Sequence, residues 1–167
     1  MIRKLKASDI AEVMQLAKAM HEESPFYNCY PFSEEKITRL YEVFLHDPDW
    51  LCVVAEFNEK IIGFLAVTIV PTFFGDARFV EDISFYVEPK YRGTSAALRL
   101  VRFVEEWAIM NEVAAIRVGI TTGTNPKAAG SFFVRLGYEE SGRLYTKLVG
   151  MSNQGFFANS VKIWLAN

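Results

Sequence analysis

Two adjacent carboxylates stand in an apolar stretch of the chain. The sequence RFVEDISFYV, residues 78–87, is rich in β-branched and aromatic residues and predicts a strand that carries Glu81 and Asp82. Successive residues of a strand point to opposite faces, so only one carboxylate can face a given site. Glu81 shares its face with Ile83 and further apolar residues, and a desolvated carboxylate there favours a base that works near neutral pH. The alternative is a solvated carboxylate or one paired with Arg78.

The strand is followed by a segment of small and hydroxyl residues. The sequence VEPKYRGTSAALRLV, residues 87–101, predicts a tight turn at Arg92 and Gly93 and then a helix. The start of a helix has backbone N–H groups without partners and the positive end of the helix dipole, and small residues let an anion approach both. The segment lacks GxxxxGK[ST] and GxGxxG, which leaves a third kind of anion site. The alternative is a turn that only permits close packing of the helix.

This segment resembles motif A of the GNAT N-acetyltransferase superfamily. In that family a strand, V-x-P and then R/Q-x-x-G-x-G/A precede a long helix and hold the pyrophosphate of acyl-coenzyme A. Here Val87 and Pro89 match V-x-P, and Arg92 and Ala97 match the first and last positions of the second motif, whereas Ser95 stands where the family usually has Gly. The resemblance implies a set of cofactor-binding residues within the segment, with hydroxyls at two of them available to phosphate: Val87, Arg92, Gly93, Thr94, Ser95, Ala96 and Ala97.

A second segment continues the resemblance. NPKAAGSFFVRLGY, residues 125–138, is similar to the family pattern N-x-x-A-(x)-Y-x-x-x-G-[FY], and this implies that Asn125 and Phe133 lie at the cofactor. Asn125 stands one residue early in this register and has the alternative role of a helix cap. In the family a Tyr commonly protonates the departing thiolate, and Phe133 occupies its position. Tyr138 is therefore the expected acid, with Tyr145, water or unaided departure of the thiolate as alternatives.

The resemblance implies an enzyme that transfers an acetyl group from acetyl-CoA, as cosubstrate, to an amine of a small molecule or a protein. The net charge of -2 and pI near 5.8 favour a cationic or neutral amine and argue against nucleic acid as a partner. Two other functions stay open. Phe133 and Ser95 fit a non-catalytic acyl-CoA-binding module, and the apolar segment 156–165 fits an oligomeric interaction protein.

The elements before the carboxylates alternate between helix and strand patterns. A short strand, IRKL, precedes a helix that Asp9 and Glu12 are expected to open as a capping box. Residues 24–32, SPFYNCYPF, predict an aromatic loop that faces either the core or a substrate. Ser33 is expected to cap a second helix, and WLCVVAEF with IIGFLAVTIV predicts an antiparallel hairpin.

The elements after the carboxylates complete the prediction. A long amphipathic helix over 94–110 is followed by a strand at 114–120, a helix from Asn125 to about residue 136, and a hairpin or bent strand at 138–149. The order predicts an α/β fold with a mixed, largely antiparallel sheet flanked by helices, as in GNAT proteins. We expect one domain over residues 1–167, with 151–167 as a C-terminal strand or as a tail that forms a homodimer.

Composition sets the remaining expectations. About half of the 167 residues are hydrophobic and 14% are aromatic, which is enough for a sizeable core. No run is long enough to span a membrane and no signal peptide is recognisable, so we expect a soluble, cytoplasmic protein. Cys29 and Cys52 have no metal or CxxC spacing and are expected to be free thiols. His21 and His46 lack partners at metal-site or triad spacing, and no metal site is expected.

Overall fold

The structure, a computed structural model, describes residues 1–147 and divides the chain into two compact units. The first, which we call the sheet unit, contains Met1–Met20 and Ser33–Gly119. The second, which we call the loop unit, contains His21–Phe32 and the chain from Ile120 onward. The expectation of one domain over the whole chain stays a prediction, and its C-terminal part, 151–167, lies outside the described residues, as does the apolar segment 156–165.

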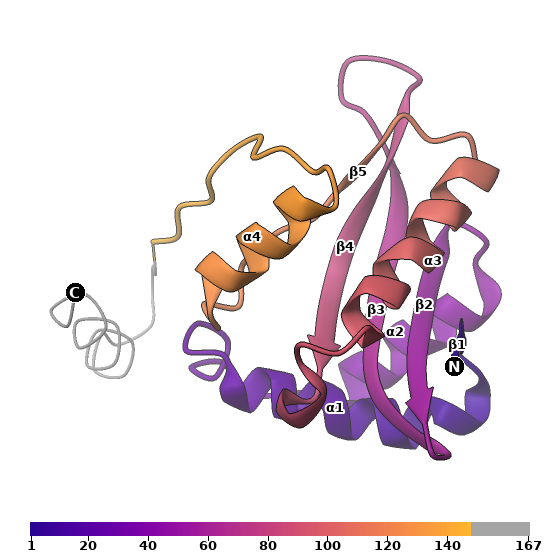
Figure 1. Cartoon of the computed structure of the whole chain (residues 1–167). Coiled ribbons are helices and arrows are strands. Elements are labelled where there is room, and N and C mark those ends of the chain that lie inside the picture. Colours follow the sequence, from indigo (N-terminus) through magenta and orange to yellow (C-terminus); the bar gives the residue numbers. More distant parts are fainter. Residues whose placement is uncertain (148–167) are drawn as a thin grey trace, which may run out of the picture. The chain divides into compact units, whose positions relative to one another are not determined.

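The sheet unit is built on a five-stranded sheet in the order β1-β2-β3-β4-β5. All neighbours are antiparallel except β4 and β5, which run parallel, so the predicted mixed, largely antiparallel α/β sheet is confirmed (Figure 1). The strands span Ile2–Lys4 (β1), Trp50–Phe57 (β2), Lys60–Pro71 (β3), Arg78–Val87 (β4) and Ala115–Arg117 (β5). The last strand is shorter than the predicted 114–120, and its pairing with β4 ends at Glu81 and Arg117.

Helices of the sheet unit cover its sheet. Two 3-10 turns, η1 (Ala7–Asp9) and η2 (Pro89–Tyr91), precede α1 (Ile10–Glu23) and α3 (Ala96–Met110); the other two helices are α2 (Glu34–His46) and, in the loop unit, α4 (Pro126–Arg135). Residues 51–55 of β2 and 61–67 of β3 are buried without alternation. A strand that is buried at every position has both faces covered. In Figure 1, α3 lies along one face of the sheet, where it contacts β2 and β3.

Several predicted caps and turns are confirmed. The Ser33 hydroxyl accepts a hydrogen bond from the Lys36 N–H (3.3 Å) and so opens α2. Asn58 and Glu59 adopt positive φ (49° and 60°) and make the two-residue connection between β2 and β3. Positive φ at both residues matches the right-handed twist of a hairpin. The long β2–β3–β4 meander is therefore specified locally at its first turn.

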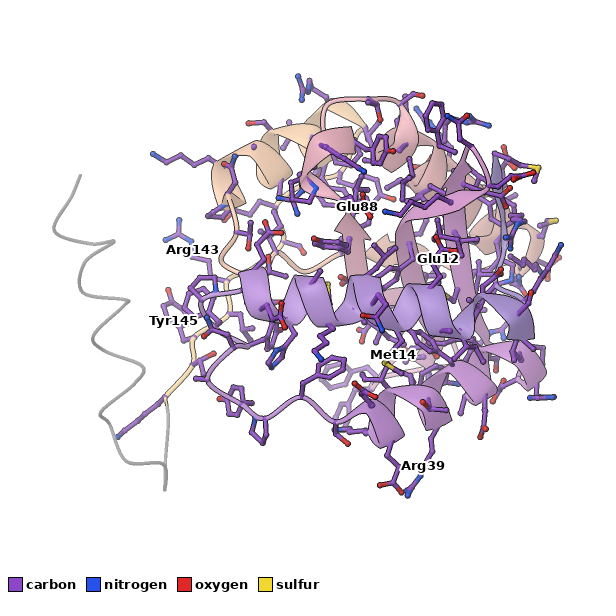
Figure 2. The ribbon with its side chains drawn as sticks, turned by 90° about the horizontal axis from the view of Figure 1, so that it is seen from below. Glu12, Met14, Arg39, Glu88, Arg143 and Tyr145 are labelled. Carbon is purple, nitrogen blue, oxygen red and sulfur yellow. The ribbon has the colours of Figure 1, made fainter. Side chains whose placement is uncertain are left out.

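The predicted capping box of Asp9 and Glu12 is wrong. Asp9 lies at the end of η1, where its carboxylate accepts the Lys6 N–H (2.7 Å) and both guanidinium ends of Arg3 (2.6 and 3.0 Å). The Arg3 guanidinium therefore holds the pKa of Asp9 below its usual range. Glu12, which Figure 2 shows on α1, instead accepts the backbone N–H of Ile61 (2.8 Å). Asp9 thus accepts from Arg3 of β1 as well as from the start of its own turn, and Glu12 accepts from Ile61 of β3. Both carboxylates therefore tie the first helical segment to strands of the sheet.

Residues 138–147 form neither helix nor strand, so the hairpin or bent strand predicted for 138–149 is wrong over that range; residues 148 and 149 lie outside the described part. Leu144 and Tyr145 are 75% and 85% exposed. The alternation of this segment has no sheet to bury it among the described residues, and an isolated alternating segment is not stable as a strand. No helix within residues 1–147 is long and apolar enough to cross a membrane.

Candidate functional site

The turn between β4 and α3 depends on Gly93. Its φ is +83°, a left-handed conformation that favours glycine, and a Cβ placed there would meet no atom within 4 Å. Gly93 is therefore required for backbone conformation and not for lack of space. Gly93, Thr94 and Ser95 are exposed, and Ala96 is buried. The open side of the turn gives a ligand access to the backbone at the start of a 15-residue helix.

The two hydroxyls of this turn differ in what they can do. Thr94 Oγ1 donates to the Tyr91 carbonyl (2.7 Å) and accepts the Ala96 N–H (3.3 Å). A hydroxyl has one proton, so the expectation that Thr94 donates to a phosphate is wrong for this conformation. Ser95 is the N-cap of α3, with φ of -72°, and its side chain makes no capping hydrogen bond. An ordinary φ means that Ser replaces the family's Gly here without backbone strain.

Arg92 closes the turn from the strand side. Its Nε donates to the carbonyl of Val87 (2.9 Å), and its guanidinium lies over the ring of Tyr86, 5.3 Å from the centroid. The side chain is thereby held against the end of β4. Val87 is buried and its carbonyl is the acceptor, so these two predicted residues are brought together with Gly93 in one turn.

A β-bulge in β4 changes the environment of the two carboxylates. Ala66 pairs with Ser84 and the next residue, Val67, pairs with Asp82, so Ile83 is the extra residue. The alternation on which the apolar face of Glu81 depended is interrupted there. Glu81 is instead 44% exposed at its side chain and pairs with Arg117 (3.2 Å). The prediction of a desolvated Glu81 is therefore wrong, and its partner is Arg117 and not Arg78, which pairs with Asp49.

Asp82 is the carboxylate that burial affects. Its Oδ1 accepts the backbone N–H of Gly119 (2.7 Å), just beyond the last β4–β5 pair. Burial raises the pKa of Asp82, although the hydrogen bond from Gly119 opposes this shift. The side chain continues the connection between β4 and the chain after β5, where the strands themselves no longer pair. Sequence reasoning missed Arg117 and Gly119, because the parallel register that brings them to β4 has no local signal.

Ala97 is half-buried in the first turn of α3, and the loop unit holds the other predicted residues. Asn125 has φ of 47° and its side chain accepts the Ala128 N–H (3.3 Å), so it caps α4 as the alternative interpretation expected. Phe133 is buried, and its ring lies edge-on to that of Tyr138 at 5.4 Å between centroids. The Tyr138 hydroxyl oxygen is buried, whereas Tyr145 is 85% exposed. Phe133 and Tyr138 are thus brought together, in a different unit from Glu81 and Gly93.

The aromatic loop 24–32 is joined to the segment before α4 by Ser24, a residue that sequence reasoning did not single out. Ser24 is fully buried; its hydroxyl donates to the Thr122 carbonyl (2.6 Å) and accepts the N–H of Tyr27 (3.1 Å). The Tyr27 hydroxyl donates to Thr121 Oγ1 (2.9 Å). Gly123, with φ of +73°, lies so close that a Cβ there would be 2.4 Å from the Phe26 ring. The Gly within TTGT was the available signal for this close approach.

Comparison with known proteins identifies the family of the chain. Residues 13–138 match the family described as the acetyltransferase (GNAT) family. A curated relative, thialysine N-epsilon-acetyltransferase of Mus musculus, is 26% identical over 128 residues, which are 71% of this chain and 73% of the relative.

Solved structures match over nearly their whole length. AAC(6')-Iy in complex with the bisubstrate analogue CoA-S-monomethyl-acetylneamine has a TM-score of 0.74 at 16% identity, covering 90% of this chain and 98% of that one. Glucosamine-6-phosphate N-acetyltransferase from Arabidopsis thaliana has a TM-score of 0.69 at 17% identity, covering 89% and 97%. At such identities these two matches show the shared fold, whereas the family match spans most of the chain. The chain belongs to the GNAT acetyltransferase family.

Proposed function

We propose that the protein transfers an acetyl group from acetyl-CoA to a primary amine of a small cationic or neutral acceptor. The observation that carries the proposal is the exposed turn at Gly93, with an open approach to the start of α3. The GNAT acetyltransferase family uses acetyl-CoA, which supports the choice of donor. The turn fits a pyrophosphate, because the exposed backbone of residues 93–95 and the helix dipole both favour an anion there.

The reaction needs one base. The amine nitrogen attacks the carbonyl carbon of the thioester, the C–S bond breaks with its electron pair on sulfur, and the nitrogen loses a proton. We keep Glu81 as the proposed base. Its partial exposure and its contact with Arg117 favour proton transfer through an ordered water over direct contact with the amine. Asp82 is the second candidate, because desolvation raises its pKa and a raised pKa makes a carboxylate a stronger base.

The departing thiolate needs a proton or must leave without one. Tyr138 is the proposed donor, supported by its buried hydroxyl oxygen and by its contact with Phe133, which stands at the position of the usual family Tyr. A thiol with a pKa near 8.5 leaves without full protonation at only moderate cost, so loss of this donor is expected to slow the reaction modestly. We expect Asn125 to act on acetyl-CoA through the shape of the α4 start, since its side-chain oxygen already caps that helix.

We base the choice of acceptor on the net charge of the protein and on the name of the mouse relative. The mouse relative's name specifies acetylation of a side-chain amine of thialysine. The aromatic loop carries Phe26, Tyr27 and Tyr30 at 38–42% exposure, and aromatic faces attract ammonium groups. We therefore propose an amino-acid-like or polyamine-like acceptor. The predicted cytoplasmic location and the homodimer through the C-terminal strand stay predictions.

The test is turnover with a panel of amines. Loss of the thioester absorbance should be followed, because a thiol reagent would also react with Cys29, which is not buried. Lysine, thialysine and a polyamine are expected to be acetylated, with products identified by mass spectrometry, and an anionic amine is expected to be poor. Glu81→Gln should lower kcat by roughly 10²–10⁴-fold, the range typical for loss of a general base.

The matched control is Asp82→Asn. It retains an oxygen for the Gly119 N–H and should change kcat much less than Glu81→Gln. The opposite ranking would assign the base to Asp82. The second candidate function, an acyl-CoA-binding module without catalysis, is favoured by Phe133 and Ser95; acetyl-CoA binding without turnover of any amine would support it and overturn the proposal of catalysis.

A further inference from the structure

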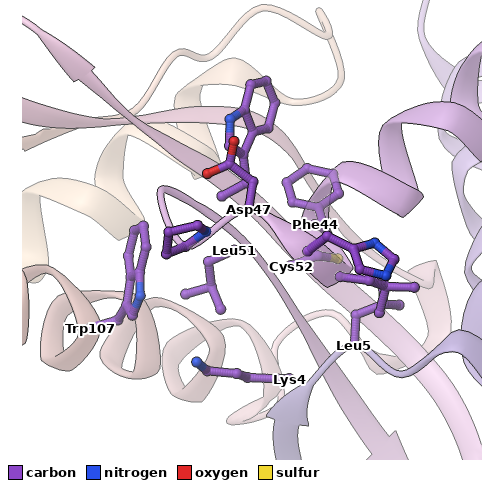
Figure 3. Close-up of a pocket in the computed structure, with 11 residues that line it drawn as sticks. Lys4, Leu5, Phe44, Asp47, Leu51, Cys52 and Trp107 are labelled. Carbon is purple, nitrogen blue, oxygen red and sulfur yellow. The ribbon is translucent and has the colours of Figure 1, made fainter.

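A cavity in the sheet unit has no part in the proposed acetyl transfer. It measures about 270 Å³ and is lined by residues of β2, of α3 and of the ends of β1 and α2 (Figure 3). All of its lining residues belong to the sheet unit. One of them, Trp107, lies eleven residues after Ala96 in α3, which is about 16 Å along a helix. The cavity is therefore separate from the turn at Gly93, where α3 begins.

The buried part of the lining is apolar and largely aromatic. Leu51 and Cys52 are 3% and 1% exposed, and burial raises the pKa of the Cys52 thiol to about 12, so this thiol is uncharged at neutral pH. Phe44 and Trp50 lie edge-to-face at 5.7 Å between ring centroids, and Trp107 adds a third ring. An engineered apolar cavity of about 150 Å³ holds benzene, so this larger cavity has room for one aromatic ring with a short side chain.

Two hydrogen-bond donors without acceptors line the cavity. Trp107 is 5% exposed, and its indole N–H has no acceptor among residues 1–147; the nitrogen is not sealed from solvent, so it opens to the cavity that Trp107 lines. Lys4 is exposed and forms no ion pair within the same residues. In Figure 3 its ammonium extends toward Trp107. An indole N–H and an ammonium on one side of a cavity favour a ligand that brings an anionic oxygen there.

Asp47 gives the other side of the cavity a different preference. Figure 3 shows Lys4 and Asp47 on opposite sides of Leu51, and the two form no ion pair with each other. Asp47 Oδ1 accepts the N–H of Asp49 (2.9 Å), which leaves Oδ2 as an acceptor for a ligand. A second anionic group on the ligand would be repelled by this carboxylate, whereas a hydroxyl would donate to it.

We propose that the cavity binds an aromatic monocarboxylate whose ring carries a hydroxyl at the end away from the carboxylate. The ligand carboxylate accepts from Lys4 Nζ and from the Trp107 N–H, the ring lies over Leu51 among the three aromatic side chains, and the hydroxyl donates to Asp47. A mostly apolar lining with a few polar groups that fix orientation is typical of a small-molecule site. Such a ligand has no amine, so it is not the acetyl acceptor.

The test is a titration of the nitrogen-15-labelled full chain with 4-hydroxyphenylacetate, followed by NMR through the indole N–H resonances of the three tryptophans. The resonance that is missing from Trp107→Phe belongs to Trp107. We expect this resonance to shift saturably, with a Kd between about 10 μM and 1 mM, as for a ligand of about a dozen non-hydrogen atoms. The absence of a saturable shift at about 10 mM ligand would overturn the proposal.

Related ligands test the two ends of the site separately. Tyramine has the same ring and hydroxyl but an ammonium in place of the carboxylate, and we expect it to bind roughly 10–100-fold more weakly. 4-Carboxyphenylacetate, whose second carboxylate faces Asp47, should also bind more weakly. Tyramine binding as tightly as 4-hydroxyphenylacetate would overturn the proposal and would assign the main contact to Asp47.

Variants test the two charged residues. Lys4→Met should weaken 4-hydroxyphenylacetate roughly 10–100-fold, whereas Lys4→Arg should retain most of the affinity; Lys4 is exposed, so both variants should fold. Asp47→Asn retains an oxygen for the Asp49 N–H and should narrow the difference between 4-carboxyphenylacetate and 4-hydroxyphenylacetate. Unchanged affinity in Lys4→Met would overturn the proposal. Gly93→Asp should leave this titration unchanged, so failure here is distinguishable from failure of the acetyl-CoA site.

Discussion

Gly93 is the residue on which the candidate cofactor site depends most directly. Asn and Asp both tolerate positive φ and have the same shape, and the space around Gly93 is open. Gly93→Asn and Gly93→Asp therefore form a matched pair that differs in charge alone. We expect Asn to bind acetyl-CoA within a fewfold of wild type, and Asp to bind at least tenfold more weakly, because a carboxylate would lie against the pyrophosphate.

Calorimetry with acetyl-CoA measures this difference. The gap between Asn and Asp should narrow at high salt, where charges at the surface are screened. Equal affinities of the two variants for acetyl-CoA would show that the pyrophosphate does not bind at this turn.

Asp82 gives a prediction on pH and stability. Its pKa is raised in the folded protein, so between the unfolded value near 3.9 and the folded value the native state binds more protons than the unfolded state. Stability contributed by this group is therefore greatest in acid and falls as pH rises through that window. Asp82→Asn should raise the free energy of unfolding at pH 7, with the difference from wild type vanishing below about pH 4. Urea denaturation at both pH values measures it, and an Asn variant that is less stable at pH 7 would contradict the assigned burial.

Local signals at the residue scale were read correctly where the partner lies within a few positions. Ser33 and Asn125 cap their helices, as their side chains and neighbours predicted. Glu12 shows the limit of such reading, since its carboxylate accepts from Ile61, 49 positions away. A long-range acceptor has no signature in the spacing of nearby residues.

At the scale of elements, the β-bulge explains why the position of β4 in the sequence was predicted correctly and the side to which its residues point was not. The span of β4 agrees with the prediction, because six of its ten residues are β-branched or aromatic and this is a strong signal. The extra residue, Ile83, shifts the alternation of side chains between Glu81 and Ser84. The composition of the strand gives no indication of this bulge. Which of the two carboxylates has its pKa raised by desolvation was therefore beyond the sequence.

The contact between the aromatic loop and the segment before α4 gives a prediction at this scale. Gly123→Ala would strain a backbone at φ +73° and push against the Phe26 ring, whereas Gly137→Ala, at φ +91° in open space, would cause strain alone. We expect about 1–2 kcal/mol loss of unfolding free energy for Gly137→Ala and a larger loss for Gly123→Ala. Urea denaturation of both variants gives the comparison. A loss for Gly123→Ala no larger than that of its control would show that the ring moves aside without cost.

At the scale of the whole molecule, the order of elements was predictable and their assembly was only partly so. The meander of β2, β3 and β4 and the helix that follows are local in sequence, and the turn from β4 into that helix carries much of the resemblance to the GNAT family. The parallel pairing of β5 with β4 joins residues 36 positions apart and placed Arg117 beside Glu81. The sequence also contained the exposed Phe73 and Phe74 without indicating that they project from the sheet unit.

The most direct test of the account is thermal unfolding of wild type and Gly93→Asp with acetyl-CoA, with ATP as a control for general phosphate binding. Ligand at 100 times its Kd stabilises the folded state by about 2.7 kcal/mol, which for a chain of this size corresponds to a rise in Tm of roughly 5–10 °C. We expect that rise for wild type with acetyl-CoA, a much smaller one for Gly93→Asp, and little change with ATP. An unchanged Tm of wild type at millimolar acetyl-CoA, or an equal rise for Gly93→Asp, would contradict the assignment of the turn before α3 as the site for acetyl-CoA.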